Sequence, residues 1–197
     1  MARGKVVIVT GIPGAGKSTV CRELLALASE RDVKVSVLNY GDVMMEIMAE
    51  KGRELHRDDI RKMGMAIQKE VQAEAAAKLA EAAERAEGHV IIDTHMIVKT
   101  GFGYLPGLPK HVLEALRPDL LVLIEASPQE IAERRPKDAD RRRDVRTIEE
   151  LEEELAFSRM VASACSVFTG APVAIIMNRT GRQREAAEQL LKLLVEG

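Results

Sequence analysis

The eight residues 11–18, GIPGAGKS, match the pattern G-x-x-x-x-G-K-S/T over its full length. They stand between a run of β-branched residues at 6–9 and a helix-like stretch that begins at Lys17. In this setting the glycines allow a tight turn whose backbone N–H groups point inward at an anion, and the N-terminus of the helix adds partial positive charge. The motif therefore predicts a phosphate-binding loop between the first strand and the first helix of an α/β fold.

Length and charge limit the classes of protein to which the chain can belong. Its 197 residues, 46% hydrophobic and 30% charged, suffice for one well-buried core, so we expect a single domain over residues 1–197. The formal net charge of −2, from 29 basic and 31 acidic residues, argues against a general polyanion binder. Nucleic acid is therefore not a required partner, and any contact with it would need a local basic patch.

The cysteines and the N-terminus bear on the cellular compartment. Cys21 and Cys165 lie in apolar, helix-like surroundings without metal-type spacing, which favours reduced core thiols over a metal cage or a disulfide framework. No apolar run approaches the length of about 18 residues that a membrane span needs. The N-terminus enters a strand too soon for a signal peptide. We therefore expect a cytoplasmic protein without a membrane partner.

Short apolar runs alternate with longer amphipathic ones along the chain. The runs that read as strands are 5–10, 33–38, 89–93, 119–125 and 172–177. The helical stretches are 17–31, 42–51, 57–87, 109–116, 128–135, 147–168 and 181–195. Because the apolar runs lack polar alternation, both faces of the sheet should be covered. This order predicts a three-layer α/β/α fold with a five-stranded parallel sheet and a ligand site at the carboxyl ends of the strands.

Polar residues at those strand ends are candidates for the site. Lys17 supplies a point charge for the β- and γ-phosphates of a nucleotide, and Ser18 a direct hydroxyl ligand for Mg²⁺. Asp93 ends a buried strand, where its carboxylate can accept from Mg²⁺-bound water or from a loop hydroxyl. Asp42 is a natural helix N-cap beside Gly41, which leaves room for a ligand.

Three further residues in this part of the chain have two interpretations each. His95 either contacts substrate or only forms part of the wall of the site through hydrogen bonds, and Lys99 either reaches a second phosphate or is solvated. The stretch 101–109, GFGYLPGLP, is expected to be a rigid loop. Its aromatic residues, which include Tyr104, would either wall a base pocket or pack in a small core of the loop's own.

The segment 134–146 carries seven basic and three acidic residues in thirteen. Guanidinium groups are suited to the negative charge that builds up in phosphoryl transfer, so the segment could close over a nucleotide and exclude water. The alternatives are a solvated charge run or an RNA-contacting patch. Arg61 and Arg159 could likewise aim at phosphate or be ordinary surface residues.

The strings VTGIPGAGKST, NYGD, IIDTH, GYLPGLP and FSRMVASA together form a pattern that covers residues from about 4 to 195. Their order and spacing resemble the archaeal-type adenylate kinases of the P-loop nucleoside monophosphate kinase group. The resemblance implies reversible transfer of the γ-phosphoryl group of Mg·ATP to AMP. It also implies a mobile AMP-binding segment at about 39–70, an arginine lid at about 135–147 and a homotrimer.

The resemblance also implies roles for individual residues. The ATP phosphates would be held by Thr10, Gly11, Ile12, Pro13, Gly14, Ala15, Gly16, Lys17, Ser18 and Thr19. The AMP side would comprise Asp42, Arg61, His95 and Lys99. The catalytic set would be Lys17, Asp93, Arg134, Arg141, Arg142 and Arg159, with Asp93 holding Mg²⁺ through water. Two positions depart from the family's pattern, since Lys99 replaces an arginine and Pro136 a polar residue.

The nature of the acceptor leaves alternatives open. A phosphate oxygen of AMP is already anionic, so direct in-line transfer needs alignment and charge neutralisation but no strong base. No catalytic base stands out beyond Asp42 and Asp93, which favours a nucleotide over an alcohol acceptor. A shikimate- or gluconate-type kinase, or another nucleoside monophosphate kinase, is the nearest alternative. An RNA-associated nucleotide-binding switch or ATPase is an alternative of another class.

Overall fold

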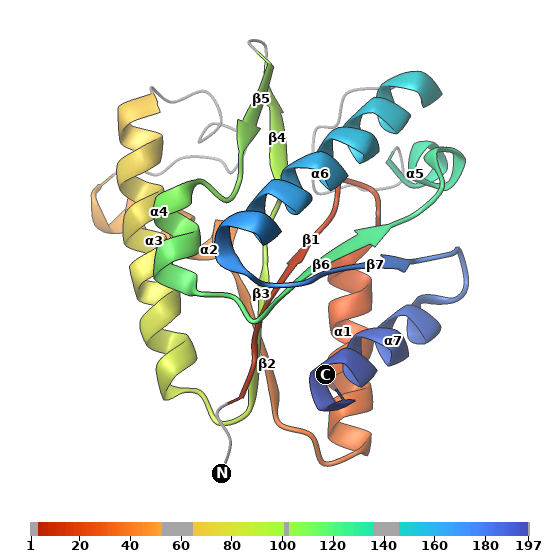
Figure 1. Ribbon diagram of the computed structural model, residues 1–197, viewed down its shortest axis with the longest axis horizontal. Helices are drawn as coiled ribbons and strands as arrows, with labels where there is room; N and C mark the ends of the chain where they lie inside the picture. Colours follow the sequence, from red (N-terminus) through yellow and green to blue (C-terminus); the bar gives the residue numbers. More distant parts are fainter. Residues whose placement is uncertain (1–3, 53–64, 101–102, 136–145, 197) are drawn as a thin grey trace.

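The computed structural model describes residues 4–52, 65–100, 103–135 and 146–196. Its centre is a five-stranded parallel sheet in the order β2-β3-β1-β6-β7, as the sequence predicts (Figure 1). The strands are β1 (Val6–Thr10), β2 (Val35–Asn39), β3 (His89–Asp93), β6 (Leu120–Glu125) and β7 (Val173–Met177). In this register Asn39 pairs with Asp93, and Asp93 with Val9. The polar ends of neighbouring strands therefore meet at one edge of the sheet.

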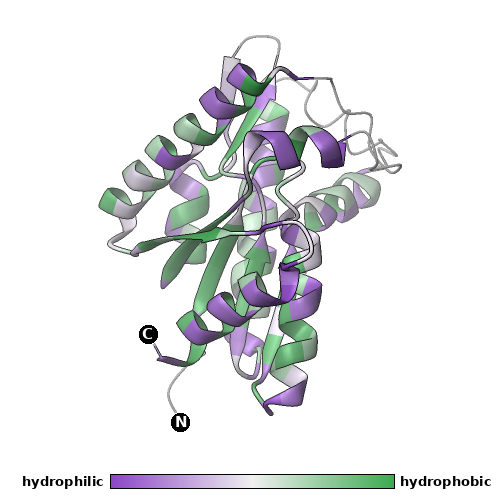
Figure 2. Ribbon diagram, turned by 90° about the vertical axis from the view of Figure 1, so that its right-hand side faces the viewer, coloured by the Kyte–Doolittle hydropathy of each residue, from purple (hydrophilic) through white to green (hydrophobic). Residues whose placement is uncertain are grey.

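Helices cover both faces of the sheet, and each face has its own apolar cluster (Figures 1 and 2). The helices are α1 (Lys17–Glu30), α2 (Tyr40–Glu50), α3 (Met65–Arg85), α4 (Lys110–Leu116), α5 (Pro128–Arg134), α6 (Ile148–Thr169) and α7 (Gln183–Glu196). Val6 and Ile8 pack into the cluster under α3, α4 and α6, whereas Val7 and Val9 pack under α1 and α7. Alternate residues of β1 thus serve opposite cores, which explains the uninterrupted apolar run.

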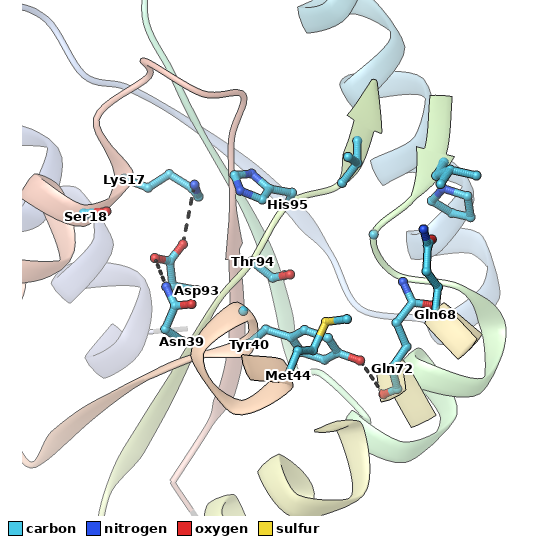
Figure 3. Close-up of a pocket in the computed structure, with 15 residues that line it drawn as sticks. Lys17, Ser18, Asn39, Tyr40, Met44, Gln68, Gln72, Asp93, Thr94 and His95 are labelled. Carbon is cyan, nitrogen blue, oxygen red and sulfur yellow. Dashed lines mark hydrogen bonds and ion pairs between the residues drawn. The ribbon is translucent and has the colours of Figure 1, made fainter. Parts of the chain in front are cut away.

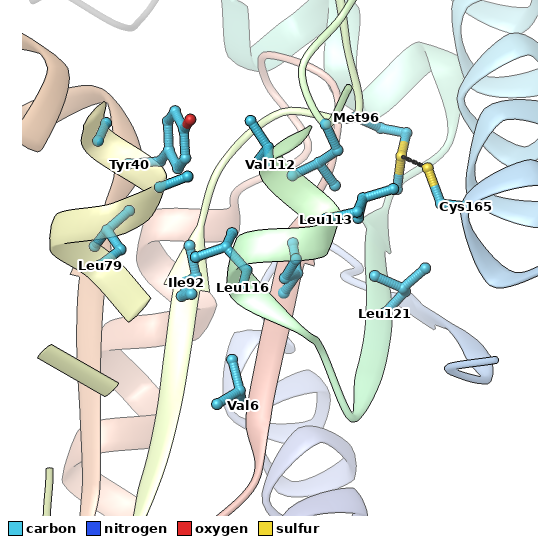
Figure 4. Packing of buried hydrophobic residues seen from close by; sticks show 14 of the residues in the cluster. Val6, Tyr40, Leu79, Ile92, Met96, Val112, Leu113, Leu116, Leu121 and Cys165 are labelled. Carbon is cyan, nitrogen blue, oxygen red and sulfur yellow. Dashed lines mark hydrogen bonds between the residues drawn. The ribbon is translucent and has the colours of Figure 1, made fainter. Parts of the chain in front are cut away.

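The larger of these clusters lies between the sheet and helices α3, α4 and α6 (Figure 4). The Sγ atom of Cys165 on α6 lies 3.9 Å from the Sδ atom of Met96 in this core. Cys21 on α1 is buried on the other face, where burial raises the pKa of its thiol to about 12. Both thiols are therefore buried core groups, as predicted, and Cys21 stays protonated near neutral pH.

The expectation of a simple loop over 101–109 is wrong for its described part. Strands β4 (Ile97–Thr100) and β5 (Gly103–Pro106) pair as a two-stranded antiparallel sheet. The Tyr104 ring of this hairpin stacks on Phe157 of α6, with ring centroids 4.8 Å apart. Isolated two-stranded hairpins are marginally stable, so this packing against a helix stabilises the hairpin. The local sequence pattern gives no sign of this contact. Tyr104 thus packs in a small core rather than in a base pocket.

The helix predicted over 57–87 is described from Met65 and ends at Arg85, and its first part lies outside the described residues. Gly88 follows with a φ angle of 95°, a conformation that favours glycine.

Within the described ranges, no helix has the length and apolar character needed to cross a membrane.

Candidate functional site

The phosphate-binding loop lies between the end of β1 and the first turn of α1. Gly14 and Gly16 have φ angles of 96° and 87°, in the left-handed region that glycine adopts without strain. The Ala15 N–H donates to the Ile12 carbonyl at 3.1 Å, which closes the turn. The loop runs directly into the N-terminus of α1, whose partial positive charge favours an anion there.

Side chains from distant segments hold the carbonyl groups of this loop. Asn178, at the end of β7, donates through Nδ2 to the Ala15 carbonyl at 2.8 Å. Arg134 on α5 reaches the same oxygen at 3.4 Å. A Cβ atom on Gly16 would lie 2.4 Å from Asn178 Nδ2, so the close approach excludes larger residues. Side chains from the end of β7 and from α5 therefore fix the conformation of the loop from outside.

A buried ion pair supports the other side of the loop. Arg135 donates through Nε to the Pro13 carbonyl at 2.9 Å and through Nη2 to Glu154 Oε2 on α6 at 3.2 Å. Both side chains are under 10% exposed. The sequence marked Arg135 only as part of an arginine-rich segment and gave no sign that Glu154 lies beside it. Arg135 thus ties α6 to the phosphate-binding loop.

Lys17, Asp93 and Asn39 form a polar cluster beside the loop (Figure 3). Lys17 Nζ lies 3.6 Å from Asp93 Oδ1, and Asn39 Nδ2 donates to Asp93 Oδ2 at 3.0 Å. Asp93 Oδ1 is buried and makes no hydrogen bond within the structure. A buried carboxylate oxygen with spare acceptor capacity, in the same pocket lining as Ser18, fits a water molecule bound to Mg²⁺.

The prediction that Asp42 caps α2 is wrong. The helix begins at Tyr40, and its N-cap is Asn39, whose side chain accepts from the Asp42 N–H at 3.2 Å. Asp42 lies in the first helical turn and is exposed, outside the lining of the neighbouring pocket. Asparagine is as good a cap as aspartate, and here its Nδ2 group also binds Asp93, so one residue serves both the helix and the polar cluster.

A pocket of about 930 Å³, including its open mouth, extends from this cluster (Figure 3). Its lining comprises Lys17, Ser18, Asn39, Tyr40, Gly41, Met44, Gln68, Gln72, Asp93, Thr94, His95, Val98, Leu105, Pro106 and Gly107. The β4–β5 hairpin and the end of β5 thus form one wall, and α2 and α3 the other. Met44, Gln68 and Gln72 could not be predicted from sequence as pocket residues, because helical periodicity cannot distinguish a core face from a pocket face.

Two residues predicted for the AMP side lie in different places. His95 lines the pocket, with Nδ1 3.3 Å from the Gly11 carbonyl, so it contacts both the cavity and the loop. Lys99 lies outside the lining, and its Nζ atom donates to Glu150 Oε1 at 3.1 Å. This ion pair connects the hairpin to the first turn of α6. The Lys99 ammonium is therefore directed at a carboxylate here, while Arg61 lies outside the described residues.

The predicted arginines are only partly within the described chain. Arg159 on α6 pairs with Glu125 at the end of β6, its Nε lying 2.9 Å from Oε1. This carboxylate is 1% exposed and keeps the guanidinium beside the end of β6, the strand that pairs with β1. Arg134 donates to the Asn178 carbonyl and to Thr180 Oγ1. Both residues thus lie at the carboxyl edge of the sheet, whereas Arg141 and Arg142 lie outside the described residues.

Glu130 on α5 links this edge of the sheet to the β7–α7 connection, because it accepts from the Thr180 N–H. Its ionisation should make the stability of the fold vary with pH in the acid range. Burial raises its pKa, but hydrogen bonds from Thr180 and Ser127 outweigh that effect and lower the pKa to about 2. Its stabilising contribution is therefore full above the ordinary pKa of 4.5 and is lost as pH falls towards 2. Glu130→Gln should melt below the wild type at pH 7, with a gap that narrows between pH 5 and 2. A gap of constant size would contradict this linkage.

The comparisons with known proteins decide the family. A family described as "AAA domain" matches residues 10–152. An adenylate kinase of Methanopyrus kandleri is 46% identical over 190 residues, covering 96% of this chain and 97% of the relative. An adenylate kinase of Methanocaldococcus jannaschii is 41% identical over 192 residues, covering 98% and 99%. The chain belongs to the adenylate kinases. It is thus a nucleoside monophosphate kinase, as its motifs predicted.

Solved structures agree with this adenylate kinase at the level of fold. "TT1252" from Thermus thermophilus matches with a TM-score of 0.61 and 18% identity over all of both chains. A shikimate kinase from Acinetobacter baumannii in complex with shikimate matches with a TM-score of 0.59 and 18% identity, covering 98% of this chain and 93% of that one. At this identity the likeness shows a shared α/β fold and carries no substrate over.

Proposed function

We propose that the chain transfers the γ-phosphoryl group of Mg·ATP reversibly to AMP, giving two ADP, by direct in-line displacement. One observation carries the proposal: the pocket beside the phosphate-binding loop has charged side chains at one end and neutral amide side chains at the other. Lys17 and Asp93 lie at one end, and the amides of Gln68 and Gln72 at the other, with Tyr40 among the residues between (Figure 3). A nucleoside monophosphate has this polarity, with an anionic phosphate at one end and a hydrogen-bonding base at the other.

The proposed mechanism relies on alignment and charge. The loop amides and Lys17 hold the donor phosphates, and an acceptor phosphate at the charged end of the pocket would face them without a base to deprotonate it. The Ser18 hydroxyl, and Asp93 through water, would hold a magnesium ion, which would supply positive charge to the donor phosphates. Arg159, oriented by Glu125, and Arg134 would stabilise charge on the transferred group. From the family pattern alone, we propose that Arg141 and Arg142 also stabilise this charge and that Arg61 lies on the AMP side.

The remaining parts of the proposal concern motion, assembly and compartment. We propose that 39–70 and 135–147 move during the cycle and that the protein acts in the cytoplasm. We also propose a homotrimer, which the mass in solution tests. The support is an exposed apolar surface on α6 and the edge strand β7. It comprises Met160, Val167, Phe168, Ile175 and Met177, which are between 43% and 89% exposed. Such a surface favours association with a second copy.

An acceptor panel tests the proposed reaction. The protein is incubated with Mg·ATP and, separately, AMP, GMP, CMP, UMP or shikimate, and ADP formation is followed. We expect AMP to give the highest rate, because the pocket offers neutral amides to the base and a cation to the phosphate. If AMP gave no rate above background ATP hydrolysis, the proposal would fail; a rate with shikimate alone would support the alcohol-kinase alternative.

A further inference from the structure

Asn178 is a buried amide whose two polar atoms are used unequally. It follows β7 directly and is 1% exposed. Its Nδ2 group donates to the Ala15 carbonyl at 2.8 Å, whereas its Oδ1 atom is buried and makes no hydrogen bond within the described part of the chain. A buried acceptor without a partner costs free energy. Packing alone therefore does not explain an asparagine here, since an apolar residue would avoid this cost.

The backbone of Asn178 is held independently of the phosphate-binding loop. Its N–H group donates to the Glu125 carbonyl at 2.6 Å, one residue beyond the pair that Glu125 forms with Met177. Its carbonyl accepts from Arg134 Nη2 at 3.0 Å. Both backbone groups are thus fixed by β6 and α5. The carboxamide therefore reaches Ala15 from a position that the sheet sets.

The peptide bond between Ala15 and Gly16 turns this contact into an orientation. The described chain contains no cis peptide bond. In a planar trans peptide the carbonyl and the following N–H group point in opposite directions. Because the Ala15 carbonyl faces Asn178, the Gly16 N–H group faces away from Asn178. Backbone N–H groups that face the phosphates are what a phosphate-binding loop requires.

Glycine makes this orientation easy to lose. Gly16 has a φ angle of 87°, and glycine populates both halves of φ space, so the peptide before it rotates at low cost. A rotated peptide would aim the Ala15 carbonyl at the phosphates and repel them. The peptide before Gly14 has the same weakness, and there Arg135 Nε holds the Pro13 carbonyl at 2.9 Å. Each of these two carbonyls is thus bound by a side chain from outside the loop.

We infer that Asn178 is a positioning residue for the donor phosphates, because its Nδ2 donor keeps the Gly16 N–H group directed at them. Arg134 also reaches the Ala15 carbonyl, but at 3.4 Å the contact is longer than that of Asn178. An aspartate at this position would have the same shape, yet its carboxylate has no proton to donate and would repel the carbonyl oxygen. The inference rests on the proposed function for its kinetic consequences, whereas nucleotide binding tests it separately.

The test uses Asn178→Asp, which keeps the shape of the side chain, and Asn178→Ala, which removes the carboxamide. Calorimetry gives Kd for Mg·ATP without AMP and Kd for AMP without ATP. The ¹⁵N resonance of the Gly16 amide reports on the hydrogen bond at the adjoining Ala15 carbonyl. Gln189→Glu, which changes an exposed amide on α7 to an acid, is the matched control. Thermal melting establishes that each variant is folded, and the formation of ADP from Mg·ATP and AMP is measured in parallel.

We expect Kd for Mg·ATP to rise about tenfold in both Asn178 variants, because a hydrogen bond to a charged phosphate is weakened, and Kd for AMP to change less than about twofold. The Gly16 resonance should move in both variants and stay in place in the control.

A rise of Kd for Mg·ATP below about threefold in a folded variant would overturn the inference. Equal weakening of Mg·ATP and AMP, or unfolding of both variants, would also overturn it, because Asn178 would then be only structural. If the wild type binds Mg·ATP but forms no ADP that depends on AMP, the proposed function has failed, while the two Kd values still decide the role of Asn178.

Discussion

Replacing Lys17 with methionine should lower kcat for phosphoryl transfer from ATP to AMP by about 10²- to 10³-fold. The Lys17 side chain is 9% exposed, and its ammonium group lies 3.6 Å from Asp93 Oδ1 at the mouth of the phosphate-binding loop. Methionine keeps most of the length of the side chain but removes the positive charge that we propose stabilises the transferred phosphoryl group. Because this charge matters most where negative charge develops, kcat should fall more than the affinity for ATP.

Two further variants make the Lys17 result interpretable. Lys192→Met changes an exposed lysine on α7, far from the loop, and should leave kcat unchanged. Lys17→Arg keeps the charge but presents a planar fork in place of a compact ammonium group, so it should restore only part of the activity. Thermal melting of all three variants controls for folding. If Lys17→Met retained half of the wild-type kcat, Lys17 would not have the proposed role.

The second large effect should come from Arg135→Met, which we expect to lower the free energy of unfolding by about 3–5 kcal/mol. The substitution leaves the Glu154 carboxylate, 4% exposed, without its cationic partner in the interior. It also removes the donor to the Pro13 carbonyl, so the phosphate-binding loop loses one of its fixed points. KM for ATP should therefore rise together with the loss of stability. Urea unfolding and steady-state kinetics measure the two effects.

The double variant Arg135→Met/Glu154→Leu separates these consequences. With both charges replaced by apolar groups, most of the lost stability should return, because no unpaired charge remains in the interior. KM for ATP should stay raised, since the Pro13 carbonyl still lacks its donor. Arg184→Met, which breaks an exposed pair with Glu30, is the control and should change stability little. A double variant no more stable than Arg135→Met would contradict the role of the buried pair.

The sheet could be predicted from sequence because its signals are local. The residues of β1 alternate between two apolar cores, and this leaves the uninterrupted apolar run that a covered parallel strand requires. The β4–β5 hairpin could not be predicted in the same way. Each of its strands has four residues, and its stability depends on the stacking of Tyr104 on Phe157, 53 residues away. Short elements that depend on distant partners leave little trace in a local pattern.

In the candidate site, too, residues marked by local sequence signals could be predicted, whereas contacts between distant segments could not. The phosphate-binding loop and Asp93 could be predicted because each lies at the end of a strand that the sequence marks. Asn178, which holds Ala15, is 163 residues away from it, and nothing in the intervening pattern places the two together. The error at Asp42 has another cause: two good capping residues lie three positions apart, and the choice of Asn39 depends on its second contact with Asp93.

The stoichiometry of the reaction tests the central claim most directly. Purified protein is mixed with Mg·ATP and AMP in equal amounts, and all three adenine nucleotides are quantified over time. If the chain transfers a phosphoryl group between nucleotides, one AMP should disappear for each ATP, and two ADP should appear. The reverse reaction from ADP alone should reach the same ratio of nucleotides. Loss of ATP with one ADP formed and AMP unchanged would instead show hydrolysis and contradict the account.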